Sequence, residues 1–279
     1  MPDTPHPDSG SAVTRGIGRI GQKAIDLLHL VGGTTGLTRM VGAWYLRSLR
    51  RSRVRLGWPA IVAQMVRVGV RSMTIVLVVS ACIGLILAIS MYPPLSELGQ
   101  ESKIANIVGI AVFREMGPII SAVVLTGFAG ASIAAEIGTM VVGEEIEALE
   151  AHALDPVRFL VLPRMTATAV SLVLLTVLAD VTAVAFSCGV SVLFFDVGLT
   201  TYIDNTLAQL NLADFLTGLL KAATFGLMLG AIACYNGLRV SGGAAGVGKA
   251  TTDTVVQTIV AVIVSDLLYD AVFLELGWT

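Results

Sequence analysis

The sequence predicts an all-α, polytopic membrane protein with five transmembrane helices, an interfacial amphipathic helix near the N-terminus and a short cytoplasmic helix. Of its 279 residues, 55% are hydrophobic and 14% are charged, and the mean hydropathy is +0.82. A soluble domain carries roughly 25% charged residues, so most of this surface cannot face water. Glycine is abundant, with 29 residues and no collagen-like period, which suits closely packed membrane helices.

The region before the first apolar run is polar and basic. Residues 1–14 contain proline and two aspartates, which argue against a signal peptide, so we expect a flexible tail. Residues 15–71 hold 11 of the 18 Lys and Arg side chains, and residues 37–71 contain no acid. Apolar residues recur there at helical spacing, at Leu37, Met40, Val41 and Trp44. This pattern predicts a basic amphipathic helix on an anionic membrane face, with a solvated basic linker as the alternative.

The first two apolar stretches differ in length. Residues 72–91 are uncharged and supply the roughly 20 residues that one crossing needs, and Pro93-Pro94 is expected to end the helix. Residues 104–142 are too long for one simple crossing and carry a charged pair before Pro118. We expect one long helix kinked near Pro118, with two shorter passes as the alternative.

Three further apolar segments complete the predicted transmembrane domain, residues 72–279. They lie at residues 165–195, 214–238 and 254–274. The arginine-rich start orients the spans, because loops rich in Lys and Arg stay on the cytoplasmic side. The N-terminus and the loops at 143–164 and 239–250 are therefore cytoplasmic, and five crossings place the C-terminus outside.

Ionisable side chains within the predicted spans define an internal polar face. They are Arg114, Glu115, Asp180, Lys221 and Asp266. Each costs roughly 2.5–3.5 kcal/mol near the bilayer centre, so each must face protein, water or another charge. Lys221 is the obvious partner for a carboxylate on another helix, and Asp270 follows Asp266 by one helical turn. This charge network either takes part in function or only fixes helix packing.

The cytoplasmic loop contains an acidic segment that is too polar to cross the membrane. Residues 143–152 predict a short amphipathic helix, which Asp155-Pro156 stops. Its acids are Glu144, Glu145, Glu147 and Glu150, and its apolar stripe is Ile146, Leu149 and Leu154. Such a helix suits docking into a groove on a partner protein. A surface helix without a partner is the alternative.

Familiar motifs for nucleotides, metals and hydrolysis are absent or out of context. Residues 16–21 fit G-x-G-x-x-G, but no strand precedes them. Residues 243–249 have the spacing of a phosphate-binding loop, yet Ala250 stands where a hydroxyl would hold magnesium. The three cysteines lie far apart, and H-E-x-x-H and G-x-S-x-G do not occur. We therefore predict no catalytic residue, no metal site, no cofactor bound by this chain and no nucleic-acid partner.

A series of motifs follows in a fixed order along the chain. The series is Phe113-Arg-Glu-Met-Gly-Pro118, Ala135-Glu-Ile-Gly-Thr-Met140, Glu144-Glu-Ile-Glu-Ala-Leu149, Asp155-Pro156, Pro163-Arg164, Gly237-Leu-Arg-Val-Ser-Gly-Gly243 and Gly248-Lys-Ala-Thr-Thr252. Together, over roughly residues 60 to 275, they resemble the MlaE/YrbE family of ABC permeases. Those permeases serve lipid-transporting MCE systems.

The resemblance implies partners and residue roles. The partners would be a second permease copy or paralogue, a cytoplasmic ABC ATPase that binds ATP and Mg²⁺, and an extracytoplasmic MCE-domain protein that forms a lipid conduit. The acidic segment would be the coupling helix on the ATPase, through Glu144, Glu145, Ile146, Glu147, Leu149 and Asp155. Arg114 and Glu115, with Lys221, would border a lipid cavity. That cavity would be lined by Leu87, Tyr92, Leu95 and Leu98.

The sequence and the resemblance together predict a permease subunit without an ATPase site of its own, in the bacterial inner membrane. It would move phospholipid or a related lipid between that membrane and the MCE conduit. Fatty acids and sterols fit the same apolar cavity with a polar rim. An ion-coupled secondary transporter of an amphiphilic substrate is the alternative, and a membrane-embedded lipid-modifying enzyme ranks below it.

Overall fold

The computed structural model describes residues 12–50, 57–275 and 277, and every regular element in this part of the chain is helical. Five helical segments are long and apolar enough to cross a membrane, which confirms the predicted number of spans. They run over Trp58–Glu97, Glu101–Val142, Val157–Phe194, Leu212–Leu238 and Gly243–Glu275. Residues 1–11, most of the predicted tail, lie outside the described residues, and helix begins at Ala12.

Short π-helical turns interrupt the first three spans. The first span comprises α2 (Trp58–Met65), the turn η1 (Val66–Val70) and α3 (Arg71–Glu97). The second begins with a 3₁₀ turn and comprises α4 (Ile104–Ala111), η3 (Val112–Met116), α5 (Gly117–Leu125), η4 (Thr126–Gly130) and α6 (Ala131–Val142). The third comprises η5 (Val157–Val161) and α8 (Leu162–Phe194).

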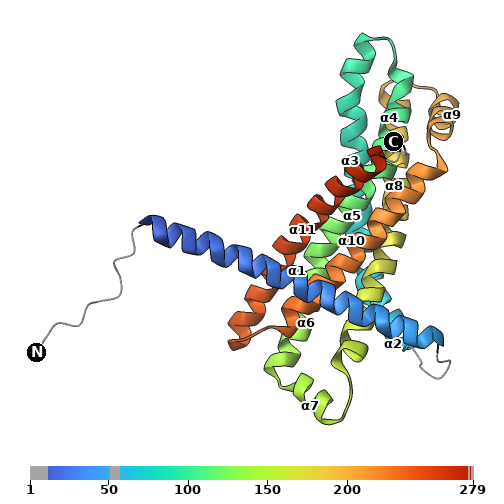
Figure 1. Ribbon diagram of the computed structural model, residues 1–279. Helices are drawn as coiled ribbons and strands as arrows, with labels where there is room; N and C mark the ends of the chain where they lie inside the picture. The colour runs from blue at the N-terminus through green and yellow to red at the C-terminus, as the bar shows by residue number, and fades with distance from the viewer. Residues whose placement is uncertain (1–11, 51–56, 276, 278–279) are drawn as a thin grey trace, which may run out of the picture.

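Two further spans and three helices outside the spans complete the chain. The spans are α10 (Leu212–Leu238) and α11 (Gly243–Glu275), and the other helices are α1 (Ala12–Arg50), α7 (Glu145–Ala151) and α9 (Leu199–Gln209). The spans form an elongated bundle with α7 at one end, and with α9 and the end of α11 at the other (Figure 1). The two ends of the bundle are therefore built from different loops.

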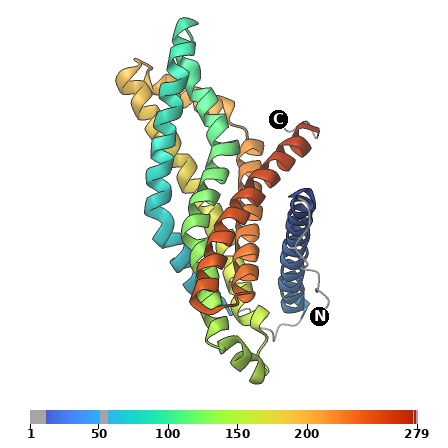
Figure 2. The ribbon, with the colours of Figure 1, turned by 90° about the vertical axis from the view of Figure 1, so that its left-hand side faces the viewer.

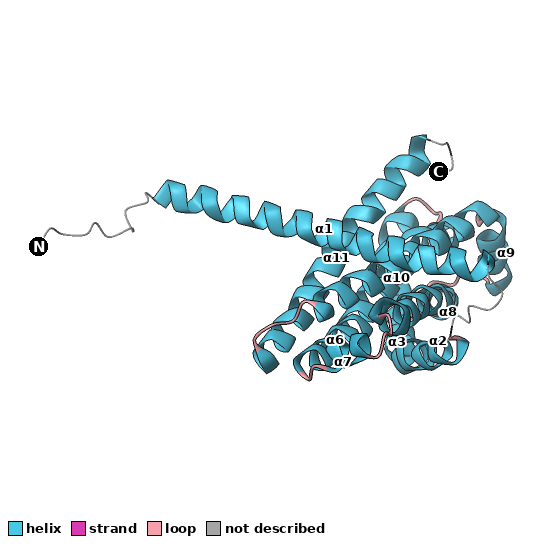
Figure 3. Ribbon diagram, turned by 60° about the horizontal axis from the view of Figure 1, so that its bottom comes forward, coloured by secondary structure: helices cyan, strands magenta, loops and turns pink. Residues whose placement is uncertain are grey.

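Helix α1 lies across the side of the bundle near the end that carries α7 (Figure 1). In the turned view it lies to one side of the spans (Figure 2). Its N-terminal half extends beyond the bundle (Figure 3). Its C-terminal half is attached, because Val41 joins the hydrophobic core and the Tyr45 hydroxyl lies 2.5 Å from Thr166 Oγ1. The Tyr235 hydroxyl also donates a hydrogen bond to the backbone oxygen of His29, at 2.9 Å. Helix α1 is therefore held against the side of the bundle.

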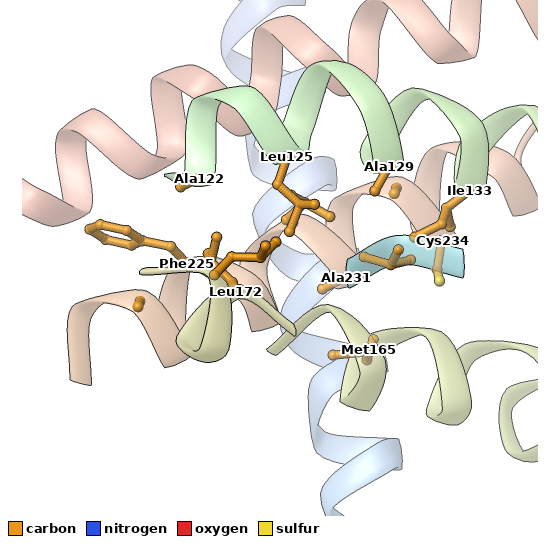
Figure 4. Close-up of a cluster of buried hydrophobic side chains, with 14 of the residues drawn as sticks. Ala122, Leu125, Ala129, Ile133, Met165, Leu172, Phe225, Ala231 and Cys234 are labelled. Carbon is orange, nitrogen blue, oxygen red and sulfur yellow. The ribbon is translucent and has the colours of Figure 1, made fainter. Parts of the chain in front are cut away.

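The hydrophobic core lies between the second, third and fourth spans. Figure 4 shows side chains of these spans pointing toward one another, among them Leu125, Leu172 and Phe225. Small residues bring the helices close. A Cβ added at Gly226 or Gly230 of α10 would lie 2.7 Å or 2.8 Å from a Cα of α8. Close backbone approach through small residues is the usual way in which membrane helices pack.

The first span differs from its prediction at both ends. Pro93-Pro94 does not end the helix, because α3 continues to Glu97 with both prolines inside it. A proline removes one backbone donor but keeps a helical φ, and one more turn is tolerated near a helix end. At the other end the helix starts at Trp58, so the predicted boundary between residues 71 and 72 falls inside a continuous helix.

The second span is one pass, as expected, and the alternative of two shorter passes is wrong. Pro118 follows the π turn η3, in which the Gly117 amide donates to the Val112 carbonyl five residues earlier. A π turn adds a residue to the helix, and such turns often occur at functional sites. Here the turn carries Arg114 and Glu115.

Helix α9 lies between the predicted spans 165–195 and 214–238, where the sequence analysis predicts no helix. Leu199, Ile203 and Leu207 recur every four residues and are exposed, while Tyr202 and Thr206 between them are buried. The Tyr202 hydroxyl donates to Ser187 Oγ at 2.9 Å, and burial raises the pKa of this phenol above its ordinary value. The four-residue period of these exposed apolar side chains was the sequence signal for this helix.

We predict that Gly84→Ala destabilises the protein. A Cβ at residue 84 would lie 2.0 Å from the Ala183 backbone oxygen, so α3 and α8 would have to move apart. Overpacking of this kind costs roughly 1–3 kcal/mol. Thermal unfolding in detergent should show a lower midpoint for Gly84→Ala. Gly189→Ala is the matched control on α8, where no atom lies within 4 Å. Equal midpoints for the two variants would contradict the close contact.

Candidate functional site

A cluster of charged side chains joins three spans near the end that carries α9. Arg114 and Glu115 lie on η3, and four more members come from α10 and α11. These are Asp214, Lys221, Asp266 and Asp270. We call these six residues the charge network. The π turn and the two facing helices bring together residues that lie up to 156 positions apart in the sequence.

Lys221 is the centre of the charge network, and its side chain is fully buried. Its ammonium donates hydrogen bonds to Glu115 Oε2 at 2.7 Å and to Asp270 Oδ1 at 2.6 Å. Asp266 Oδ1 lies 2.9 Å from the same nitrogen. The expected pairing of Lys221 with a carboxylate on another helix is therefore present, with three carboxylates in place of one.

Arg114 lies at the edge of the charge network. Its Nε is 3.9 Å from Glu115 Oε1, and its Nη1 is 3.9 Å from Asp214 Oδ1. Asp214 itself caps α10, because its carboxylate accepts a hydrogen bond from the Asn211 amide at 3.1 Å. The capping box thus fixes the carboxylate that faces Arg114.

The charge network carries more negative than positive charge. Two cations face four carboxylates, so the net charge is −2 when all six groups are ionised. Unbalanced charge in a bilayer is unfavourable, and it attracts a proton or a positively charged ligand group. Two carboxylates are also the most accessible members, since the side chains of Asp270 and Glu115 are 44% and 26% exposed.

Three carboxylates of the charge network approach the geometry of a metal site. One oxygen each from Glu115, Asp266 and Asp270 lies within 4.8 Å of the others. The Lys221 ammonium, however, lies within 2.9 Å of all three and takes the position that a cation would occupy. The arrangement therefore favours an internal counter-ion over a bound metal.

Asp180 does not join the charge network with Asp266. It is 1% exposed on α8 and makes no ion pair with any other residue of the described part of the chain. Its Oδ1 packs against Gly117, where an added Cβ would lie only 1.7 Å away. Asp180 thus occupies the space of a side chain at residue 117. Asp180 and Asp266, which were predicted to belong to one network, therefore lie at two separate sites.

The residues expected to line a lipid cavity are placed on one side of the first span. Leu87, Tyr92 and Leu95 are partly buried against the outer parts of α4 and α8, in a cluster with Ala88 and Val108. The Tyr92 ring stacks on Phe195 at 4.0 Å. Leu98 is 71% exposed. Leu87, Tyr92 and Leu95 therefore pack within the bundle, whereas Leu98 lies at its surface.

The acidic segment forms α7, as expected, over Glu145–Ala151. It has no buried residue, so its three glutamates, the preceding Glu144 and the half-buried Ile146 and Leu149 are presented at the end of the bundle. Glu144 enters the helix in the left-handed conformation, with φ of 58°. Such a conformation is uncommon for residues other than glycine and fixes a sharp turn after α6.

Asp155 is exposed like the glutamates, but it links the segment after α7 to α1. It accepts hydrogen bonds from Trp44 Nε1 at 3.0 Å and from the Val157 amide at 2.9 Å. The guanidinium of Arg158 stacks on the Trp44 ring, 5.1 Å from its centroid. The sequence grouped Asp155 with the coupling residues, but no spacing rule could have shown its partner 111 positions away.

The two glycine-rich motifs lie within helices. Residues 16–21 are part of α1, and residues 243–249 open α11, with no strand before either in the described residues. Neither therefore has the strand, turn and helix that a phosphate-binding loop needs.

The helical bundle, the internal charge network and the exposed acidic loop helix together define a multi-pass membrane transport subunit. Over residues 61–272 the chain matches the family described as Permease MlaE. A probable ABC transporter permease protein of Rickettsia felis is 35% identical over 77% of this chain and 83% of its own length. The probable ABC transporter permease protein RP096 of Rickettsia prowazekii is 34% identical over 90% of this chain and 99% of its own length.

A plant relative is also similar. The protein TRIGALACTOSYLDIACYLGLYCEROL 1, chloroplastic, of Arabidopsis thaliana is 29% identical over 81% of this chain and 65% of its own length. The chain belongs to the MlaE permease family and is an ABC transporter permease. Membership of this class implies a dimer and an ATPase partner.

We predict that Lys221→Met strongly destabilises the protein. The substitution would leave three carboxylates within 4.8 Å of one another without their central cation. Removing one partner of a buried ion pair costs roughly 3–5 kcal/mol. Unfolding in detergent with increasing denaturant would measure this loss. Asp270→Asn is the matched control, because its half-exposed carboxylate is one of three acceptors. Equal loss in both variants would contradict the central role of Lys221.

Proposed function

We propose that this permease moves phospholipid or a related lipid between the bacterial inner membrane and an extracytoplasmic MCE-domain conduit. A separate ATPase, which would bind ATP and Mg²⁺, supplies the energy. The plant relative named for trigalactosyldiacylglycerol, a glycolipid, supports a lipid cargo. The observation that carries the proposal is the exposed acidic helix α7, which lies at the opposite end of the bundle from α9 (Figure 1).

Helix α7 is placed to transmit force to two spans. Two residues separate it from α6, and five residues separate it from η5. A partner that binds α7 therefore acts on the ends of the second and third spans. The second span also carries η3, so its movement reaches Arg114 and Glu115 at the charge network. The Trp44–Asp155 hydrogen bond adds α1 to the moving unit.

The sign of the charge network favours a zwitterionic head group. Lys221 is buried among three carboxylates and is not available to a ligand. An ammonium of the lipid would meet the exposed oxygens of Glu115 and Asp270, while its phosphate would approach Arg114. Extraction of lipid from the purified transporter, followed by mass spectrometry, tests this preference. Recovery of fatty acid or sterol in place of phospholipid would contradict it.

We predict that Glu147→Lys combined with Leu149→Ala uncouples the ATPase. Both side chains lie on α7, and loss of central contacts typically weakens an interface by more than about tenfold. Copurification of the ATPase and ATP-driven lipid transfer into acceptor vesicles should both fall. Asp204→Lys, an exposed acid on α9, is the control and should leave copurification intact. Unchanged binding and transfer in the α7 variant would remove the coupling role.

We predict that Arg114→Glu impairs lipid transfer but not ATPase binding. The substitution adds a negative charge to a network that already has a surplus, so a phosphate would be repelled. Transfer should fall by about tenfold or more, the usual value of one charge-assisted contact. Size-exclusion chromatography would confirm an intact complex. Full transfer by the variant with both Arg114→Ala and Glu115→Ala would reduce the pair to a packing role.

The carboxylate surplus also suits a proton-coupled transporter, the rival function. Vesicles that contain the permease without any ATPase distinguish the two. The proposal expects no lipid transfer in response to a proton gradient alone, and gradient-driven transfer would favour the rival.

A further inference from the structure

A polar hollow opens between the first two spans at the end of the bundle that carries α7. Its polar side chains are Arg67, Arg71, Ser132 and Glu136, and its apolar wall includes Phe128 and Ile133. The hollow measures about 310 Å³, counting the part that is open to its surroundings. None of the six residues of the charge network, which lies nearer the other end of the bundle, lines this hollow.

The hollow has a surplus of positive charge. Arg67 Nη1 lies 2.7 Å from Glu136 Oε1, and Arg164 Nη2 lies 3.3 Å from Glu136 Oε2. One carboxylate thus serves two guanidinium groups. Arg71 is exposed and makes no ion pair with any residue in the described ranges, which leaves a local charge of +2. Guanidinium groups bind phosphate through paired hydrogen bonds, so an anionic ligand would complete this site.

The polar and apolar parts of the hollow are arranged along the membrane normal. Arg67 and Arg71 are one turn apart on the first span. On the second span, Glu136, Ser132 and Phe128 follow one another at intervals of one turn, away from α7. The order from the α7 end is therefore ion pair, then Arg71 with Ser132, then the 40%-exposed Phe128 ring. A lipid of the nearer leaflet has the same order of head group and acyl chain.

The position of Arg71 fits the boundary of the hydrocarbon layer. The uncharged run of the first span begins at the next residue, Ser72. Exposed apolar side chains lie on both sides of Arg71 in the sequence, including Val70 at 61% and Met73 at 37% exposed. A head group held by Arg71 would leave its acyl chains on this apolar surface. Basic hollows between membrane helices on the cytoplasmic side are typical sites for anionic lipid.

We propose that this hollow binds the phosphate head group of an anionic phospholipid from the leaflet at the α7 end. The occupant is a resident lipid, distinct from the transported one, because the hollow has the opposite charge to the charge network and lies near the other end of the spans. The ligand joins Arg71 and Ser132 across the first and second spans, next to the ion pairs that connect Glu136 to Arg67 of the first span and to Arg164 of the third.

The test is a titration of the purified full-length protein with lipid, read by native mass spectrometry. The probes are dioleoyl phosphatidylglycerol, dioleoyl phosphatidylcholine and inorganic phosphate. We expect phosphatidylglycerol to bind more tightly than phosphatidylcholine, and Arg71→Gln to weaken phosphatidylglycerol binding by about tenfold. Arg39→Gln, an exposed arginine of α1 outside the hollow, is the matched control and should bind as the unchanged protein does.

Several results would overturn the proposal. Equal binding of the two lipids, or unchanged binding by Arg71→Gln, would show that the hollow does not select an anionic lipid. Inorganic phosphate that displaces phosphatidylglycerol at equal concentration would make the site one for a free anion. Loss of the dimer on Arg71→Gln would show that this face is covered by a second copy. Because no measurement here involves the ATPase, failure of this proposal leaves the proposed transport function untouched.

Discussion

The need to partner every charge inside a bilayer determines most of this structure. Lys221 can lie fully buried because Glu115 of the second span and Asp266 and Asp270 of the fifth span surround it. Toward the other end of the bundle, near α7, Arg67 and Arg164 in turn share the carboxylate of Glu136. Charge therefore divides the described structure into an end with the exposed acidic helix α7 and an opposite half with an internal polar site.

Most of the architecture was predictable because hydrophobicity alone determines which segments enter a membrane. The number of spans, the single long second pass and the acidic loop helix all followed from runs of apolar residues and their interruption. Boundaries were less predictable. Pro93-Pro94 looked like a stop, yet a helix near its end tolerates missing donors. Helix α9 was not predicted, because polar residues separate Leu199, Ile203 and Leu207 and make their four-residue period hard to recognise.

The site could be predicted by residue type but only partly by contact. Arg114, Glu115, Lys221 and Asp266 were identified because ionisable groups in a membrane are expensive. Their contacts depend on the π turn η3, which no residue pattern in the sequence predicts. Asp180 has the same chemistry but packs against Gly117, and only the close approach of α5 and α8 explains it. Asp155 likewise contacts Trp44 through the placement of α1, which sequence spacing does not encode.

The central claim is that α7 meets a cytoplasmic motor while α9 and the charge network lie toward the other membrane face. Cysteine labelling measures this directly, in a variant without Cys82, Cys188 and Cys234. Glu150→Cys on α7 and Asp204→Cys on α9 are exposed positions for a membrane-impermeant maleimide. In right-side-out vesicles the account predicts labelling at residue 204 alone, and in inverted vesicles at residue 150 alone. The reverse pattern would contradict it.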